Sequence, residues 1–437
     1  MTTHRRYRLL GLAIAAWLCA GAGAGAVARA GSFPIDLAAA KKVFTDAQTV
    51  SEAEGGRLWG EKLYAKMLLV DPETRAVVSN EPDPQGVLHA RDGCYVGTLP
   101  ESLIISNAPT EWEGQHWTML MWFTIPDDRI SLHVMLAHEL FHQMQYRLHL
   151  VAQDMPAPDL DMAQGRLWLQ LEWRALAAAL ITSGPVQTAA IRDALAFRAK
   201  RHALYPNSAK AEASQEIAEG VPEYTGVVAG VPDVQAARWH AAGKLAHPDL
   251  TVSFVRSFAY TSGPAYGLLL DERSPGWRKA LTIHSDLAAL LNAALKDDLT
   301  ASAEARAPYY GAAEIRMAEE DRAAKADTEK RRYRALLVDG PTLTLPKLGH
   351  FSFNPNTLLS LGDAGTVYPT FHAIAEWGTL DVTGGILVPG DFKGARLAAP
   401  TAIDGPHLKG PGWTVELARG WSAVPASGSG SYMLQKR

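Results

Sequence analysis

Short apolar runs separated by turn-forming residues occupy the first part of the chain. This pattern indicates a helix over 33–50 and then strands, because strand formers such as Trp, Met and Phe alternate with Gly, Pro and Asp clusters. The predicted strands are 58–70, 75–79, 103–107 and 117–123. The first two flank the turn-forming segment Asp71-Pro72-Glu73-Thr74.

Apolar residues then recur at helical spacing from Pro126-Asp127-Asp128 to about residue 335. The predicted helices are 129–150, 165–182, 187–203, 210–228, 260–272, 276–295 and 312–335. The last is densely charged, which predicts a solvated helix that links two domains.

Gly, Pro, Thr and Val become frequent after Leu336, and short apolar runs again alternate with turns. These runs are Thr342–Leu348, Leu358–Leu361, Thr379–Val382, Gly385–Val388 and Trp413–Leu417. They predict a small all-β domain over 336–437. Its aromatic residues are expected in the core rather than in a ligand site: Tyr368, Trp377, Trp413 and Trp421. The whole pattern predicts an α+β protein, with a small mixed sheet, a mostly helical part and a C-terminal all-β domain.

Residues 1–30 have the pattern of a signal peptide. Arg5, Arg6 and Arg8 precede the apolar segment Leu9–Ala20, and Ala28-Arg29-Ala30 favours cleavage before Gly31. An uncleaved anchor is the alternative. We therefore expect an exported protein, periplasmic or secreted, with no stable membrane span after signal removal, because no later apolar run is long enough.

Composition narrows the function further. The 437 residues are 47% hydrophobic and 20% charged, which is typical of globular proteins. A formal net charge of −4 argues against a nucleic-acid partner, which needs clustered Lys and Arg. Removal of Cys19 with the signal peptide leaves Cys94, which we interpret as a buried thiol rather than a nucleophile.

His138-Glu139-Leu140-Phe141-His142 is a His-Glu-x-x-His pattern in a predicted helix. Residues four apart lie on one helical face, so both imidazoles can bind one metal ion, and zinc suits nitrogen ligands. Glu139 can reach a metal-bound water without binding the metal itself. The pattern predicts one Zn²⁺ per chain.

The third ligand is open at this point. Gln145 and Leu148 stand where metzincins require Gly and a third His. His133 and His149 point elsewhere on the helix or lie too far along it. A carboxylate from a later helix remains, either Glu172 or Glu219.

The alternative interpretation of Glu172 is a surface ion pair with Arg174 or Arg166. Glu216 and Glu223 share roughly one helical face with Glu219 and could orient the ligand shell, although we expect that face to be solvated.

A resemblance favours Glu219. Glu219-Gly220-Val221-Pro222-Glu223-Tyr224 resembles the Glu-Gly-x-Ala-x-Tyr segment of gluzincin metallopeptidases, in which the first Glu binds zinc. Phe258–Pro264 resembles the Tyr-x-x-Gly stretch that follows in several members. The resemblance implies a zincin-like catalytic domain over 31–335, with His138, His142 and Glu219 on zinc. It also implies that Tyr260, or less favourably Tyr224, stabilises the oxyanion.

The expected function is therefore a zinc-dependent metallopeptidase, a hydrolase acting on a peptide or protein substrate. A zinc-activated water attacks the peptide bond, and Glu139 is the general base. The strand Trp117–Phe123 is expected at a sheet edge, where it binds the peptide. Two alternatives are a zinc hydrolase of a non-peptide amide or ester, and a binding or scaffold protein that retains a zinc site.

Overall fold

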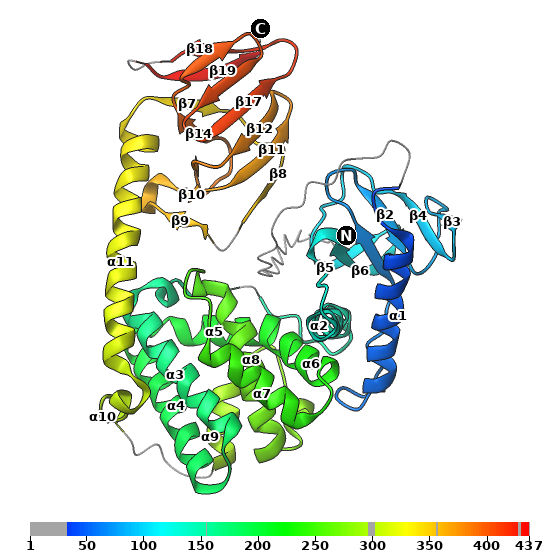
Figure 1. The fold of residues 1–437 in the computed structure, drawn as a ribbon, viewed down its shortest axis with the longest axis vertical. Coiled ribbons are helices and arrows are strands. Elements are labelled where there is room, and N and C mark those ends of the chain that lie inside the picture. The colour runs from blue at the N-terminus through cyan, green and yellow to red at the C-terminus, as the bar shows by residue number, and fades with distance from the viewer. Residues whose placement is uncertain (1–32, 154, 296–301, 355–356, 427–429, 437) are drawn as a thin grey trace, which may run out of the picture. The chain divides into compact units, whose positions relative to one another are not determined.

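The computed structural model describes residues 33–153, 155–295, 302–354, 357–426 and 430–436 (Figure 1). The predicted signal peptide lies outside the described residues. The chain forms two compact units. One comprises the described residues up to Asp249 and those of Phe254–Ile315, and the other Leu250–Ser253 with the described residues from Arg316 onward. Both helices and sheets are abundant, so the predicted mixed α+β class is confirmed.

A six-stranded sheet lies in the first unit. Its strands are β1 (Met67–Val70), β2 (Ala76–Ser79), β3 (His89–Arg91), β4 (Cys94–Thr98), β5 (Ala108–Trp112) and β6 (Gln115–Met121). Their order is β3-β4-β2-β1-β6-β5, with β1 and β6 parallel and the other neighbours antiparallel. Cys94 is a buried free thiol in β4, as expected.

Three predictions for this sheet are wrong. The strand predicted at 58–70 is confined to Met67–Val70. No strand forms at 103–107; β5 begins at Ala108, and just before it the Asn107 side chain accepts a hydrogen bond from the Met121 N–H (2.7 Å) at the end of β6. The strand predicted at the edge, Trp117–Phe123, corresponds to β6, which pairs with β1 on one side and β5 on the other. The edge strand next to it is β5.

The helices of the first unit run from α1 to α10, and α11 begins there. Their bounds are α1 (Leu37–Glu54), α2 (Arg129–Arg147), α3 (Ala163–Ile181), α4 (Gly184–Leu204), α5 (Ser208–Gln215), α6 (Val221–Gly230), α7 (Val234–Ala246), α8 (Phe254–Arg273), α9 (Leu287–Leu295), α10 (Ala303–Arg306) and α11 (Ala312–Arg334). A π-helical segment, Glu216–Gly220, joins α5 to α6 within the single helix predicted at 210–228. The helix predicted at 276–295 is a short 3₁₀ turn, Trp277–Ala280, and α9.

Close helix approaches position α2, α6 and α8. An added Cβ at Gly226 of α6 would lie 2.6 Å from the Val134 carbonyl oxygen of α2, so only glycine lets these two helices pack this closely. An added Cβ at Gly263 of α8 would collide with the backbone of Gly220 in the π-helical segment. Both contacts bring residues from distant parts of the sequence to one face of α2.

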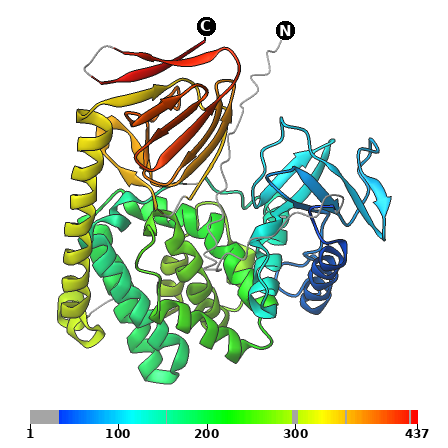
Figure 2. The same cartoon turned by 45° about the horizontal axis from the view of Figure 1, so that its top comes forward.

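The second unit is a β-sandwich (Figure 2). One sheet has the order β18-β19-β7-β14-β13-β10-β9 and the other β15-β16-β17-β12-β11-β8. The strands are β7 (Thr342–Leu345), β8 (His350–Phe353), β9 (Leu359–Ser360), β10 (Thr366–Tyr368), β11 (Phe371–Ala375), β12 (Gly378–Val382), β13 (Ile386–Val388), β14 (Ala395–Ala398), β15 (Ala402–Asp404), β16 (His407–Gly410), β17 (Trp413–Leu417), β18 (Trp421–Pro425) and β19 (Tyr432–Lys436).

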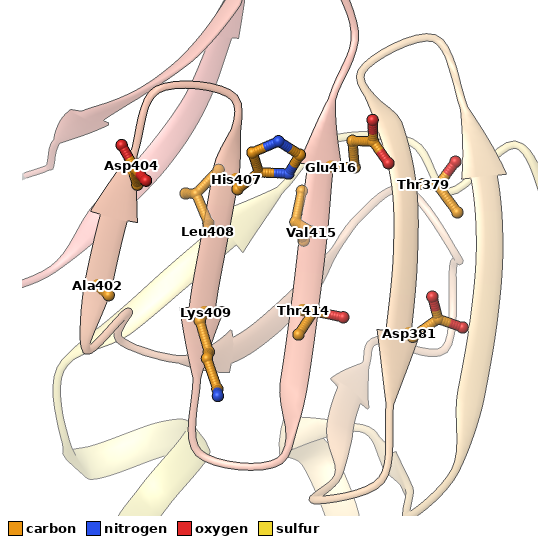
Figure 3. A pocket seen from close by; sticks show the side chains of 10 residues that line it. All are labelled: Thr379, Asp381, Ala402, Asp404, His407, Leu408, Lys409, Thr414, Val415 and Glu416. Carbon is orange, nitrogen blue, oxygen red and sulfur yellow. The ribbon is translucent and has the colours of Figure 1, made fainter.

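Side chains from both sheets share one apolar core, which holds Tyr368, Trp377 and Trp413, with Trp421 packed against it. The core interpretation of these aromatics is confirmed. The opposite face of the second sheet is polar, and Figure 3 shows side chains of β12, β15, β16 and β17 that line a shallow pocket there. The volume of this pocket is about 420 Å³. Among the described residues, no helix combines the length and apolarity needed to cross a bilayer.

We predict that Gly263→Ala destabilises the first unit, because the new methyl group collides with the Gly220 backbone. Overpacking of this kind costs about 1–3 kcal/mol in the free energy of unfolding. Gly243→Ala is the matched control, since a Cβ there meets no heavy atom within 4 Å in the last turn of α7. It should stabilise by about 0.5–1 kcal/mol. Urea unfolding measures both, and equal effects of the two substitutions would contradict the helix crossing.

Candidate metal centre

Three buried side chains converge on one point in the first unit. His138 and His142 lie one turn apart on α2, and their Nε2 atoms are 3.1 Å from each other. The Glu219 Oε2 atom, from the π-helical segment, lies 3.5 Å from His138 Nε2 and 3.6 Å from His142 Nε2. Within the described part of the chain, this is the group of His, Cys, Asp and Glu side chains that can hold a metal ion.

The donor triangle has the dimensions of a zinc site. Zinc bonds of about 2.0–2.1 Å in tetrahedral geometry require donor atoms about 3.3 Å apart. The three observed separations, 3.1, 3.5 and 3.6 Å, bracket that value. Two imidazoles and a carboxylate also match the ligand set of open zinc sites.

Hydrogen bonds to the Nδ1 atoms of His138 and His142 fix the orientation of the two imidazole rings. His138 Nδ1 lies 2.9 Å from a Glu223 carboxylate oxygen, and His142 Nδ1 lies 2.7 Å from the Gln145 amide oxygen. Gln145 Nε2 donates to the Ile217 carbonyl (2.9 Å), which sets the orientation of that amide. From this network we assign the proton of each neutral imidazole to Nδ1. Both Nε2 lone pairs then face the same point, where a cation satisfies them.

Electrostatics at His138 also favour a cation. Burial alone would lower its pKa, but hydrogen bonds to Glu219 and Glu223 outweigh burial and raise it to about 10. A metal ion would compete with this proton, because a histidine ligand binds in its neutral form. Lys244 lies 3.3 Å from Glu223. Burial would raise the pKa of Glu223, but Lys244 and His138 hold it at about 2, so this carboxylate stays charged behind the imidazole.

Glu139 differs from the other buried carboxylates of the site. Its side chain is fully buried, and neither oxygen has a hydrogen-bond partner among the described residues. Burial raises its pKa to about 7, although the charge of His138 opposes the shift. A carboxylate whose pKa lies near neutral pH, and whose two oxygens have no hydrogen-bond partner among the described residues, is suited to accept and release a proton.

Tyr260 of α8 completes this side of the site. Its hydroxyl donates to Glu219 Oε2 (2.6 Å), and its ring stacks on His138 with centroids 5.4 Å apart. Tyr224, the alternative oxyanion donor, donates instead to Asp271 (2.7 Å). The structure therefore places Tyr260, and not Tyr224, beside the three converging side chains.

Glu172, the alternative third ligand, belongs to a different buried cluster. It accepts hydrogen bonds from Arg201 (2.6 Å) and Tyr266 (2.6 Å), and Arg198 lies at 3.5 Å. The interpretation of Glu172 as a surface ion pair is therefore wrong. Its charge is compensated by residues that the spacing along one helix does not reveal.

The solvated face expected at Glu216 and Glu223 is also wrong, since both side chains are buried. His133 lies outside the group, 3.6 Å from Asp46 of α1, and His149 follows the end of α2. Two participants were missed, Gln145 and Lys244. Gln145 was recognisable three residues after His142 on the same helix. Lys244 comes from α7, a helix that the apolar pattern did not predict.

Comparisons of the chain with protein-family models, with curated proteins and with solved structures found no match.

We predict that Glu219→Ala removes stoichiometric zinc from the purified protein, because one of three donors is lost. Glu172→Gln is the control: it removes a buried carboxylate of the same length, but one that lies with Arg198 and Arg201. It should lower stability and leave one zinc per chain. Elemental analysis after dialysis measures the zinc content of both variants. If only Glu172→Gln loses zinc, then Glu172, and not Glu219, is the third ligand.

Proposed function

We propose that this chain is a zincin-like, gluzincin-type zinc metallopeptidase. The observation that carries the proposal is the convergence of two His Nε2 atoms and one carboxylate oxygen on a point beside an unpaired, buried Glu139. Glu219 and the two histidines would hold the zinc. When bound, zinc would lower the pKa of a water ligand and polarise the scissile carbonyl.

The chain's own side chains supply the proton transfers. Glu139 accepts the proton of the attacking water and later delivers it to the leaving amine. A pKa raised to about 7 suits both steps at neutral pH. Tyr260, whose hydroxyl now donates to Glu219, can instead donate to the oxyanion of the tetrahedral species. Glu223 and Gln145 keep the two imidazoles oriented.

The edge strand β5 is the element that we assign to peptide binding, in place of β6. β5 and β6 both lie against α2. The Thr118 N–H of β6 donates to the Lys66 carbonyl next to β1 and therefore points away from β5. Pro109 lies opposite Thr118 in the β5–β6 ladder, so the Pro109 carbonyl points away from β6, toward the outer edge of the sheet. Two residues along β5, Glu111 does the same with its N–H and C=O. These backbone groups can pair with an extended peptide.

Export completes the proposal. Residues 1–30 would direct the chain to the periplasm or out of the cell, and their removal would leave the catalytic unit and the β-sandwich free of an anchor. The substrate would then be a peptide or protein outside the cytoplasm.

The direct test is Glu139→Gln, which keeps the size of the side chain and removes its basicity. We predict that this variant retains one zinc per chain and cleaves a peptide library about 10²–10⁴-fold more slowly than the wild type. Mass spectrometry of the products measures the rate.

Each other result contradicts a part of the proposal. Zinc-loaded wild-type protein that cleaves esters or non-peptide amides, but no peptide, would identify a different zinc hydrolase. Zinc-loaded protein without any turnover would identify a binding or scaffold protein. Full peptidase activity in Glu139→Gln would exclude Glu139 as the base.

A second prediction concerns β5. Glu111→Pro removes the N–H that we assign to peptide pairing, and the loss of one hydrogen bond of about 0.5–1.5 kcal/mol should lower kcat/KM about 2–13-fold. Glu111→Ala, which keeps the N–H, should leave kcat/KM unchanged. Steady-state kinetics on one peptide decides, and an equal loss in both variants would point to the Glu111 side chain instead.

A further inference from the structure

Four glutamates are buried along one continuous helical run. Glu212 lies in α5, Glu216 and Glu219 lie in the π-helical segment, and Glu223 lies in α6. Their exposed fractions are 0%, 0%, 8% and 1%. Each buried carboxylate needs a compensating partner, so the directions in which they point are tightly constrained.

A regular α-helix would direct all four to one side. At 3.6 residues per turn, the spacing of these positions keeps them within an arc of about 60°. The structure separates them into two pairs. Glu212 and Glu216 face arginines of α4, whereas Glu219 and Glu223 face His138 of α2. The π-helical segment Glu216–Gly220 holds the second member of one pair and the first member of the other, and its wider turn changes the phase of the helix from one pair to the next.

This wide turn is held from two sides. Arg198 makes a bidentate pair with Glu216, with Nη1 to Oε1 at 2.6 Å and Nη2 to Oε2 at 2.9 Å. On the opposite side, the Gln145 side chain donates to the Ile217 carbonyl (2.9 Å). Glu219 follows two residues after Ile217. The orientation of its carboxylate therefore depends on a turn whose first side chain is fixed by Arg198.

We propose that Arg198 is a positioning residue of the metal centre. Acting through Glu216, it holds the wide turn in the phase that aims Glu219 at the two histidines, although Arg198 itself touches neither histidine nor Glu219. The proposal rests on the proposed metal function. The Arg198–Glu216 pair then contributes to metal affinity. A pair that only stabilised the fold would not affect metal affinity.

The test is Glu216→Gln in the full-length protein. The glutamine amide keeps the volume of the side chain, but its NH₂ group replaces one of the two acceptor oxygens. That NH₂ group then meets an N–H donor of the Arg198 guanidinium, so the bidentate pair is lost. Zinc affinity is measured by competition with a chelator, and the absorption spectrum of the Co²⁺-substituted protein reports the geometry. We expect the zinc Kd to rise about 10–100-fold, as for other residues that orient metal ligands, with an altered Co²⁺ spectrum.

Asp193→Asn is the matched control. Asp193 also lies on α4, is buried, and forms a bidentate pair with Arg306 at 2.8 Å for both contacts. It lies outside the α5–α6 run, so its substitution should lower the melting temperature without changing the zinc Kd. A similar rise of the Kd in both variants would show that general loss of stability is the cause and would overturn the proposal.

Arg198→Lys provides a second route, because lysine keeps the charge but cannot form the bidentate pair. We expect it to weaken zinc binding as Glu216→Gln does, and we expect the double variant to be no weaker than either single one. An unchanged Kd in both single variants would refute the positioning role while leaving the metal centre intact. Absence of zinc binding in the wild type would refute the metal centre as well.

Discussion

The burial of several carboxylates around His138 is the constraint on which this structure depends. Glu139, Glu219 and Glu223 all lie in the interior beside one imidazole, and Lys244 lies 3.3 Å from Glu223. Taking uncompensated charge out of water costs several kcal/mol per ion. A site with this excess of negative charge favours a cation, and the two histidine Nε2 atoms with Glu219 provide the donors for one.

The surrounding fold can be understood as the means of assembling that group. Gly226 lets α6 approach α2, which brings Glu223 to the back of His138. The crossing at Gly263 brings Tyr260 over Glu219. The wide turn between α5 and α6 separates the carboxylates that serve the metal centre from those that pair with Arg198 and Arg201. The two glycine crossings let the helices approach closely, and the wide turn directs the carboxylates to two different sides. A regular helix, or a helix contact between larger residues, would do neither.

The sequence revealed the part of the site that depends on local spacing. His138, Glu139 and His142 lie on one helix, and the contrast between α-helical and β regions follows from residue periodicity. Partners contributed by tertiary packing were less accessible. Arg198 and Arg201 meet Glu172 only after α3 and α4 pack together, so the sequence left Glu172 open between a third ligand and a surface ion pair. The edge of the sheet was misassigned because strand order does not follow from the pattern of one strand.

The central claim is that His138, His142 and Glu219 bind a zinc ion. X-ray absorption spectroscopy at the zinc edge, on the purified protein, measures the ligands directly. We predict a first shell of nitrogen and oxygen at about 2.0–2.2 Å, with the outer-shell signal of two imidazoles. A sulfur shell at about 2.3 Å, or zinc surrounded by oxygen alone, would contradict a centre built from His138, His142 and Glu219.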